Sequence, residues 1–359
     1  YLLSYILNKI GYAILTLFGV TTVIFFLFNV LPGDPAQMML GQNESEEQLQ
    51  AVRAKYGFDQ PLSTQYFYYL NDLLPISFHS TQKEDYTYLA EEKYHAAVLF
   101  SLNETDVALK TPYLRESFQK NGQKVSSVIA ETLPNTFFLA VSAIVIALLI
   151  GVFFGIISAL KKDSALDKTI QVLSTLGMSV PSFFSAILFA WFFGYVLHEH
   201  THLNMTGSLY ELDDFGEQNQ LQLKNLILPA LVLGIRPLAV VIQLMRNSLL
   251  EVLQQDYIRT AKAKGLSSAK IIRKHALKNA LNPVVTAISG WFASMLAGAV
   301  FVEYIFGWNG LGKEIVDALN TLDLPIIMGA VLIIALMFIL INIFVDIIYG
   351  WLDPKITNT

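Results

Sequence analysis

The chain has 359 residues, of which 54% are hydrophobic and 15% are charged, well below the charged fraction of about 25% that is usual in soluble domains. Its mean hydropathy of +0.49 and formal net charge of −5 exclude an ordinary soluble enzyme and a basic nucleic-acid-binding protein. Cysteine is absent, which excludes a disulfide framework and a thiolate metal site.

Several apolar segments are long enough to cross the roughly 30 Å of hydrocarbon in a bilayer. We predict six membrane-spanning helices, at 10–31, 135–160, 169–197, 225–246, 284–303 and 325–350. The first lacks a small-residue cleavage site and is too long for a removable signal peptide, so we expect it to be retained. Pro181 and Pro237 remove backbone donors inside the third and fourth spans, and each is expected to bend its helix, either for packing or to line a path.

The segment 32–134 lies between the first two spans and has an ordinary polar composition. We predict that it forms an extracytoplasmic lobe, with helices near 45–56 and 61–74. The chain then divides into an N-terminal segment with the first span at 1–31, the lobe at 32–134, and a membrane core at 135–359. No repeat or flexible linker separates these parts.

The distribution of basic residues predicts the orientation in the membrane, because Lys and Arg concentrate in short cytoplasmic loops. The segment 198–223 holds five acidic residues and no Lys or Arg, so we place it outside. The bases lie before the first span, between the second and third, and between the fourth and fifth: Lys9, Lys161, Lys162, Lys168, Arg246, Arg259, Lys262, Lys264, Lys270, Arg273, Lys274 and Lys278. We therefore predict an all-α polytopic membrane protein with both termini in the cytoplasm.

The loop 250–283 is predicted to be a cytoplasmic helical hairpin. Gly265 can adopt the left-handed conformation that ends a helix, Ser267 can cap the next helix with its hydroxyl, and Asn282-Pro283 can terminate it. In that second helix the spacing predicts two different faces. The basic face is formed by Lys270, Arg273, Lys274 and Lys278. The apolar face is formed by Ala269, Ile272, Ala276 and Ala280.

Two interpretations of this hairpin are open: it docks into a groove of a soluble partner, or it lies on anionic lipid. The small side chains of Thr260, Ala261, Ala263 and Gly265, and the lack of Trp or Phe that would enter the bilayer surface, favour docking. Because the hairpin is held at both ends by spanning helices, it can transmit a movement of the partner into the membrane. A transporter subunit driven by a soluble motor is the function that this arrangement predicts.

Arg236 is the outstanding charged residue within the spans, and an intramembrane charge is by default a functional candidate. It could bind a peptide carboxylate on the transport path, or it could bind backbone carbonyls freed by Pro237, or extend to the membrane surface. We list Arg236, Gln243, Ser179 and Pro181 as candidates for the path. Asn342 and Asp346 in the last span are interpreted as packing groups.

His198, His200 and His202 could present three imidazoles on one face of an extended segment, a geometry compatible with Ni²⁺ or Zn²⁺. The segment ends a helix and offers no fixed fourth ligand, so we expect no metal site. No catalytic residues are predicted, because the spans hold no Ser/His, Asp/Asp or His-Glu-x-x-His set. Gly310-Leu311-Gly312-Lys313-Glu314 lacks the spacing of a phosphate-binding loop, so any ATP is expected to be hydrolysed by another chain.

The hairpin and four further segments resemble the permeases of ABC-type peptide and nickel importers, a binding-protein-dependent transport family. Arg259-Thr260-Ala261-Lys262-Ala263-Lys264-Gly265-Leu266 followed by His275-Ala276-Leu277-Lys278-Asn279-Ala280-Leu281 is similar to the coupling motif of the peptide-type members. The other segments are Leu31-Pro32-Gly33-Asp34-Pro35, Tyr56-Gly57-Phe58-Asp59-Gln60-Pro61-Leu62, Val302-Glu303-Tyr304-Ile305-Phe306 with Gly310-Leu311-Gly312 and Asp323-Leu324-Pro325, and a closing run from Asp346 to Lys355. Asn309 stands where the family often has proline, and roughly 75–115 looks like an insertion.

The resemblance implies the type I ABC importer permease fold and a position in the inner membrane of a bacterium. It implies two ABC ATPase subunits that carry ATP and Mg²⁺, a second permease that is either a paralogue or an identical copy, and an extracytoplasmic substrate-binding protein. Contacts with the ATPases would be made by Arg259, Thr260, Ala261, Ala263, Lys264, Gly265, Leu266, His275, Leu277 and Asn279. Oligopeptides or dipeptides are the expected substrates, with nickel chelates as the alternative.

Two other classes of function are alternatives to this expectation. A secondary transporter or channel that is not driven by ATP would need paired membrane charges or inverted repeats, which the sequence does not display. An intramembrane enzyme would need a catalytic set inside the bilayer, which is also lacking.

Overall fold

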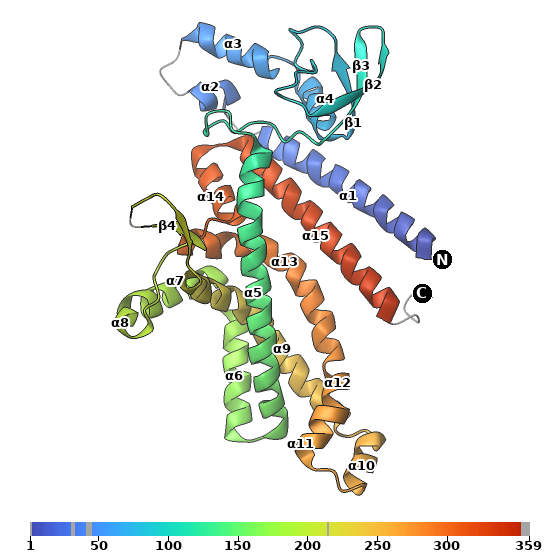
Figure 1. The fold of residues 1–359 in the computed structure, drawn as a ribbon, viewed down its shortest axis with the longest axis vertical. Coiled ribbons are helices and arrows are strands. Elements are labelled where there is room, and N and C mark those ends of the chain that lie inside the picture. The colour runs from blue at the N-terminus through green and yellow to red at the C-terminus, as the bar shows by residue number, and fades with distance from the viewer. Residues whose placement is uncertain (1, 30–32, 41–44, 214, 353–359) are drawn as a thin grey trace. The chain divides into compact units, whose positions relative to one another are not determined.

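The structure is a computed structural model that describes residues 2–29, 33–40, 45–213 and 215–352. Most of these residues are helical (Figure 1). The chain forms two compact units, the first of Tyr1–Glu131 and Asp317–Leu336 and the second of Thr132–Val316 and Met337–Thr359. The predicted end of the first span at residue 31, and the closing motif residues Asp353, Pro354 and Lys355, lie outside the described residues.

The first unit contains helix α1 (Leu2–Asn29) and three short helices, α2 (Pro35–Leu40), α3 (Glu46–Tyr56) and α4 (Leu62–Leu73). The last two confirm the helices predicted near 45–56 and 61–74. Ser45 and Gln48 form a capping box at the start of α3, in which the Ser45 hydroxyl accepts from Gln48 N at 3.3 Å and Gln48 Oε1 accepts from Ser45 N at 2.9 Å. Gly57 ends this helix in the left-handed conformation, with φ of 71°, which glycine adopts without steric cost.

Helix α4 packs against the last turns of α1. The ring of Phe25, which is fully buried, lies 5.3 Å and 5.6 Å from the rings of Tyr66 and Tyr69, and the Tyr66 hydroxyl is 2.7 Å from Thr22 Oγ1. Asp34 in the proline-flanked motif accepts a hydrogen bond from Ala36 N at 3.0 Å, at the start of α2. The motif therefore begins a helix directly after the first span.

The insertion at 75–115 contains a small antiparallel sheet, which the sequence analysis did not predict. Strands β1 (Ile76–Ser80), β2 (Ala96–Leu102) and β3 (Thr105–Lys110) are arranged in the order β1-β3-β2. Phe78 pairs with Val107, and Val107 pairs in turn with Phe100 after a register shift in β2. The lobe is thus a mixed structure of helices and strands added to a helical membrane protein.

The second unit is built mainly from long helices. Its elements, together with those that continue from the first unit, are α5 (Val125–Leu160), α6 (Ala165–Ser179), α7 (Ser182–Trp191), the π-helix η1 (Phe192–Val196), α8 (His198–Thr201), β4 (Tyr210–Leu212), β5 (Asn219–Leu221), α9 (Lys224–Val252), α10 (Asp256–Ala263), α11 (Ser268–Ile271), the π-helix η2 (Ile272–Ala276), α12 (Leu277–Ala280), α13 (Asn282–Phe306), α14 (Leu311–Thr321) and α15 (Leu324–Leu352).

Five helices of the described part are long and apolar enough to cross a membrane: Leu7–Asn29, Val125–Leu160, Lys224–Val252, Asn282–Phe306 and Leu324–Ile347. The predicted span at 169–197 is instead a pair of helices bent by 109°, so the count reaches six only if this pair is one span. The break falls at Val180-Pro181, where the missing proline donor and the clash of its ring stop the helix. A single kinked helix was therefore the wrong prediction for this segment.

The helix that contains the second predicted span, α5, begins at Val125, ten residues before the predicted position of 135. Pro134 suggested a boundary in the sequence, but it lies inside helix α5. Val125, Val128 and Ile129 are buried, so this added part of the helix is held by packing that outweighs the effect of the proline.

Close approach between α5 and α9 organises the core of the second unit. A Cβ atom added at Gly151 would lie 2.6 Å from Val241 Cγ1, and one added at Gly155 would lie 2.6 Å from Met245 Cβ. The two glycines are one helical turn apart, the small-xxx-small spacing that lets membrane helices pack tightly without a hydrophobic driving force. Helix α9 is also packed against α6, α7 and α13 and so forms the centre of this unit.

Candidate functional site

The predicted hairpin is present and is formed by α10, α11, η2 and α12. Helix α10 ends at Ala263, and Gly265 follows with φ of 75°, as the glycine at this position predicted. No other atom lies within 4 Å of a Cβ placed on Gly265, so the turn faces open space. A side chain here would be strained by the backbone conformation and would also protrude from the turn.

The hairpin has an interior of its own. Ile258 and Ala261 from α10 are buried together with Ile271, Ala276 and Ala280 from the second arm, as part of the core of the second unit. Ala261 therefore lies inside the hairpin and not on its surface. Leu266 and Leu277 are half-buried, whereas the remaining candidates for contact with an ATPase are exposed: Arg259, Thr260, Ala263, Lys264, Gly265, His275 and Asn279.

Two predicted details of the second arm are wrong. Ser267 precedes α11, but its hydroxyl makes no capping hydrogen bond. The arm also contains the π-helix η2 at 272–276, which shifts the phase of all later residues relative to an α-helix. Ile271 and Ala276, five residues apart, are both buried, and Ala280 is buried as predicted, whereas Ala269 and Ile272 are not buried. The four predicted basic residues are all exposed: Lys270, Arg273, Lys274 and Lys278.

The hairpin is joined closely to the membrane helices. Asn279 donates a hydrogen bond of 2.8 Å to the Tyr257 hydroxyl and so links the two arms. The second arm ends at Ala280 and α13 begins at Asn282, with Pro283 in the first turn, where a proline needs no donor. Pro283 therefore begins the fifth span as well as ending the hairpin.

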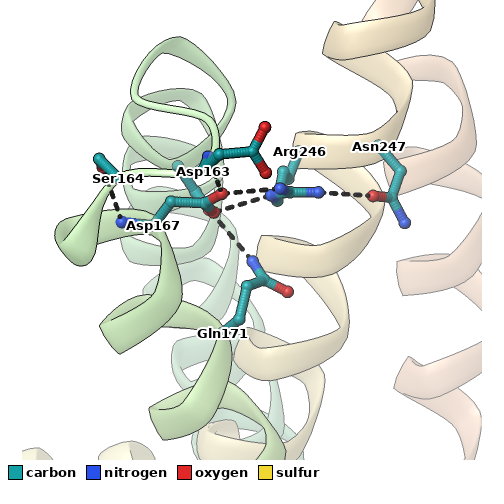
Figure 2. Close-up of polar contacts among 7 residues, drawn as sticks. Asp163, Ser164, Asp167, Gln171, Arg246 and Asn247 are labelled. Carbon is teal, nitrogen blue, oxygen red and sulfur yellow. Dashed lines mark hydrogen bonds and ion pairs between the residues drawn. The ribbon is translucent and has the colours of Figure 1, made fainter.

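An ion pair holds the helix that leads into the hairpin. Arg246 on α9 donates to both carboxylate oxygens of Asp167 on α6, from Nε at 2.8 Å and from Nη2 at 2.7 Å (Figure 2). Asp167 also accepts from Asp163 N at 2.9 Å and from the Ser158 hydroxyl. The side chains of Asp167 and Arg246 are only 3% and 18% exposed, so this is a largely buried, bidentate pair.

Arg246 is one of the bases expected in the cytoplasm, and its partner Asp167 was not predicted from the sequence. Asp167 lies in the first turn of α6, directly after the connection from α5. The pair therefore joins the α5–α6 connection to α9 within a few turns of the hairpin. The spacing of 79 residues between the two side chains gives no local signal from which the contact could be predicted.

A cavity of about 210 Å³ lies at the bend between α6 and α7, next to α9 and α13. Arg236 and Pro237 line it together with Trp291, Ser182 and Ser294. The Arg236 side chain is exposed and makes no hydrogen bond or ion pair with any residue that the structure describes. A guanidinium without a partner is costly in hydrocarbon, so this charge requires water, a ligand or another chain.

The other candidates for the path lie at different positions. Pro181 is at the break between α6 and α7, flanked by Val180 and Ser182, which line the cavity. The Ser179 hydroxyl donates to Thr175 O at 2.8 Å, and Gln243 is half-buried further along α9. Neither side chain lines the cavity, so Arg236 alone of the polar candidates does so.

The histidine segment differs from the extended geometry that was predicted. Residues 198–201 form one helical turn, α8, and His202 follows with φ of 54°. Because residues two apart in a helix point to nearly opposite sides, His198 and His200 do not share a face. No group of three potential metal ligands occurs among the residues that the structure describes. His198 Nδ1 instead contacts the Leu203 carbonyl at 2.6 Å.

The motif Gly310-Leu311-Gly312, which follows the fifth span, binds the carboxyl group of Glu303 from the same chain. Glu303, which is fully buried, accepts hydrogen bonds from Gly312 N at 2.7 Å and Lys313 N at 3.1 Å at the start of α14. A Cβ on Gly310 would lie 2.4 Å from the Glu303 carboxyl carbon, so this position needs glycine. The amides of Gly312 and Lys313 are thus occupied by a carboxyl group of the chain itself, and the motif is not a nucleotide site.

Comparison with known proteins agrees with these features. The family model for the binding-protein-dependent transport system inner membrane component matches residues 151–358, and the model for its N-terminal part matches residues 2–85. The dipeptide transport system permease protein DppB of Bacillus subtilis is 33% identical over 352 residues, covering 98% of this chain and 97% of the relative. The proteins of the same name from Escherichia coli and Alkalihalophilus pseudofirmus are each 32% identical and cover 99% of both chains.

A solved structure supports the fold of the membrane core. A chain of the MetNI methionine ABC transporter in an inward-facing conformation matches with a TM-score of 0.51 and 14% identity, covering 63% of this chain and 97% of that one. The type I importer permease fold that the sequence predicted is thereby confirmed. With the hairpin, the spans and the full-length relatives in agreement, the chain belongs to the binding-protein-dependent transport system inner membrane component family of ABC importer permeases.

Proposed function

We propose that this chain is the permease subunit of an ATP-driven importer that moves short peptides across the bacterial inner membrane. Family membership supports a multi-pass permease that works with ATPase and binding-protein subunits. The peptide substrate is supported by relatives that are similar over their whole length and are named dipeptide permeases. Dipeptides and oligopeptides are preferred over nickel chelates on this basis.

The observation that carries the proposal is the hairpin with Gly265 at its open turn. Its exposed surface is basic and made of small residues, while its interior is continuous with the core that includes α9 and α13. An ATPase that binds the exposed side would move the hairpin as a rigid body, because the close packing of its buried residues prevents its two arms from moving separately. The site offers no nucleotide loop, so we place ATP, Mg²⁺ and the hydrolytic activity on two partner ATPases.

Transport then follows from the two spans that the hairpin connects. A movement of the hairpin displaces α9 and α13 and exposes the substrate path alternately to the two sides of the membrane. The two arrangements need to differ by only a few kcal/mol, so that contacts with nucleotide-bound ATPases select one of them. A second permease subunit, either a paralogue or a second copy of this chain, would complete the path.

Arg236 is our candidate for recognition on this path. It lies in a span, lacks a partner among the described residues, and borders a cavity with serine hydroxyls and an indole. Its planar guanidinium matches the geometry of a peptide carboxylate. Arg236→Met is expected to raise the KM for peptides at least about tenfold, as for loss of a charge-assisted hydrogen bond, and Arg236→Lys is expected to restore part of the affinity. An unchanged KM in Arg236→Met would assign the arginine to packing.

The coupling proposal is tested with the complex reconstituted in lipid vesicles, by comparing ATPase rates with and without the loaded binding protein. Ala263→Trp places a large side chain on the exposed end of α10 and should abolish the stimulated rate. Ala269→Trp makes the same change at an exposed alanine of the same hairpin, outside the predicted contact residues, and should leave coupling intact. Full stimulation in Ala263→Trp would contradict docking at this surface, and uptake without ATP would favour a secondary carrier.

A further inference from the structure

The extracytoplasmic lobe contains a polar cluster around one buried carboxylate. Asp72 on α4 is fully buried and accepts hydrogen bonds from the Tyr86 and Tyr94 hydroxyls, each at 2.8 Å. Arg115 pairs with the same carboxylate from Nε at 3.0 Å. The carboxylate is therefore fully satisfied by two hydroxyls and one guanidinium.

The cluster holds more positive than negative charge. Lys110 is nearly buried, and its ammonium donates to the backbone carbonyls of Asp72 and Leu74 at 2.5 Å and 2.9 Å. The Lys93 ammonium lies 3.5 Å from the centre of the Tyr86 ring and donates to the Tyr86 carbonyl at 2.8 Å. Neither lysine forms an ion pair with a described residue. The cluster around Asp72 therefore contains one carboxylate and three cationic side chains, those of Lys93, Lys110 and Arg115.

A cavity of about 250 Å³ opens beside this cluster. Lys93 and Arg115 line it, and aromatic rings, including those of Tyr56, Tyr86 and Phe118, form much of its wall. Two further carboxylates, Glu92 and Glu116, border the same cavity. The cavity thus combines unpaired positive charge, an apolar aromatic wall and separate negative groups.

These features match the two ends and the middle of a short peptide. A carboxylate binds most strongly where ammonium or guanidinium groups are partly removed from water. Aromatic walls bind apolar side chains and the backbone, and carboxylates near the opening can bind a free ammonium group. A single anion such as phosphate would use only the cationic part of this surface.

We propose that this cavity in the lobe is a binding site for short peptides, with Lys93 as the main ligand of their C-terminal carboxylate. The chemical class of the ligand rests on the proposed peptide transport, but the site itself is separate from the cavity at Arg236. In this arrangement the permease holds a peptide on its outer side independently of the binding protein.

The charge of Lys93 gives the site a characteristic pH dependence. The pKa of Lys93 is lowered to about 8, mainly by burial and also by the positive charges of Arg115 and Lys110, while the carboxylates of Asp72 and Glu116 oppose this shift. The ammonium is charged below this pKa and neutral above it. The preference for a peptide with a free C-terminal carboxylate over its C-terminal amide should therefore fall as the pH rises past about 8. The peptide α-ammonium loses its charge in the same range, but this loss affects both peptides alike.

The test uses the whole transporter complex in lipid nanodiscs without its binding protein. The probes are the dipeptide Ala-Phe and its C-terminal amide, and binding is measured by calorimetry. We expect Ala-Phe to bind at least about tenfold more tightly than the amide, as for a charge-assisted hydrogen bond. In a complex that carries Arg236→Met, so that only the lobe can discriminate, Lys93→Met should abolish this difference. Lys83→Met, which changes an exposed lysine of the same lobe, should preserve it.

Lys93→Arg separates the role of charge from a role in folding. It should retain preference for the free carboxylate and keep it above pH 9, because arginine stays charged there. Equal binding of Ala-Phe and its amide to the wild-type complex, or an unchanged preference in Lys93→Met, would overturn the proposal. A complex that transports Ala-Phe with its binding protein yet binds none without it would overturn this site and leave the proposed function standing.

Discussion

The ion pair between Asp167 and Arg246 leads to a quantitative prediction. Arg246→Met removes two hydrogen bonds to Asp167 and leaves a carboxylate whose side chain is 3% exposed. Breaking one side of a buried pair costs about 3–5 kcal/mol. Asp167 keeps its hydrogen bonds from Asp163 N and Ser158 and Arg246 is 18% exposed, so we expect the lower part of this range, about 3–4 kcal/mol.

The prediction is checked by a double-mutant cycle. Unfolding of the purified subunit in detergent is measured for Arg246→Met, for Asp167→Asn and for the double variant. Asp167→Asn removes the buried charge but keeps an oxygen that can accept from Asp163 N, so the double variant should be more stable than Arg246→Met alone. The coupling energy between the two changes is expected to be about 1–3 kcal/mol.

The same pair is expected to affect transport, because it holds α9 just before the hairpin. In the reconstituted complex Arg246→Met should lower the ATPase rate that the loaded binding protein stimulates, with less effect on the basal rate. If each single substitution lowers the free energy of unfolding by less than about 1 kcal/mol and the two effects are additive, the pair behaves as a solvent-exposed ion pair. The view that it ties α6 to α9 would then be refuted.

Three further predictions concern packing and capping. Gly155→Leu should prevent the approach of α5 to α9 and sharply reduce the yield of folded protein on size-exclusion chromatography, whereas Gly290→Leu, at a glycine with no atom within 4 Å of an added Cβ, should be tolerated. Glu303→Ala leaves two amide donors at the start of α14 without their acceptor. It should lower the free energy of unfolding by about 1–3 kcal/mol for each amide that stays buried, and Glu303→Gln should recover part of this loss in the same measurement. Tyr94→Phe removes one hydroxyl from the Asp72 carboxylate and should destabilise the lobe by about 1–3 kcal/mol, seen as faster proteolysis of the lobe.

Much of the membrane core could be predicted from the sequence, because long apolar runs and the distribution of bases are strong local signals. The hairpin was predicted in the same way, since Gly265 and the flanking small residues identify its turn. The bend at Pro181 was underestimated, because a proline inside an apolar run can equally kink a helix or break it. Pro134 shows the opposite outcome, since it lies within a continuous helix.

The contacts that join distant segments were not predictable from one sequence. Nothing local relates Asp167 to Arg246, or Asp72 to Tyr86, Tyr94 and Arg115. The π-helix in the hairpin also lacked a signal, so Ile272 was assigned to the buried face in place of Ile271, whereas Ala276 and Ala280 were assigned correctly. The sheet in the insertion could have been inferred from the β-branched and aromatic residues of its strands, but the strong helical character of the rest of the chain concealed it.

The two ends of the sheet insertion meet, since Lys110 N donates to the Pro75 carbonyl at 2.8 Å. A segment whose ends already touch can be exchanged for a tight turn without moving the backbone on either side. Shorter chains of this architecture could therefore arise by excision of the strands in one genetic event. Such an excision would also remove Tyr86, Tyr94 and Lys110 from around Asp72 and leave its ion pair with Arg115. A chain that loses the strands should therefore keep or replace residues 72 and 115 together.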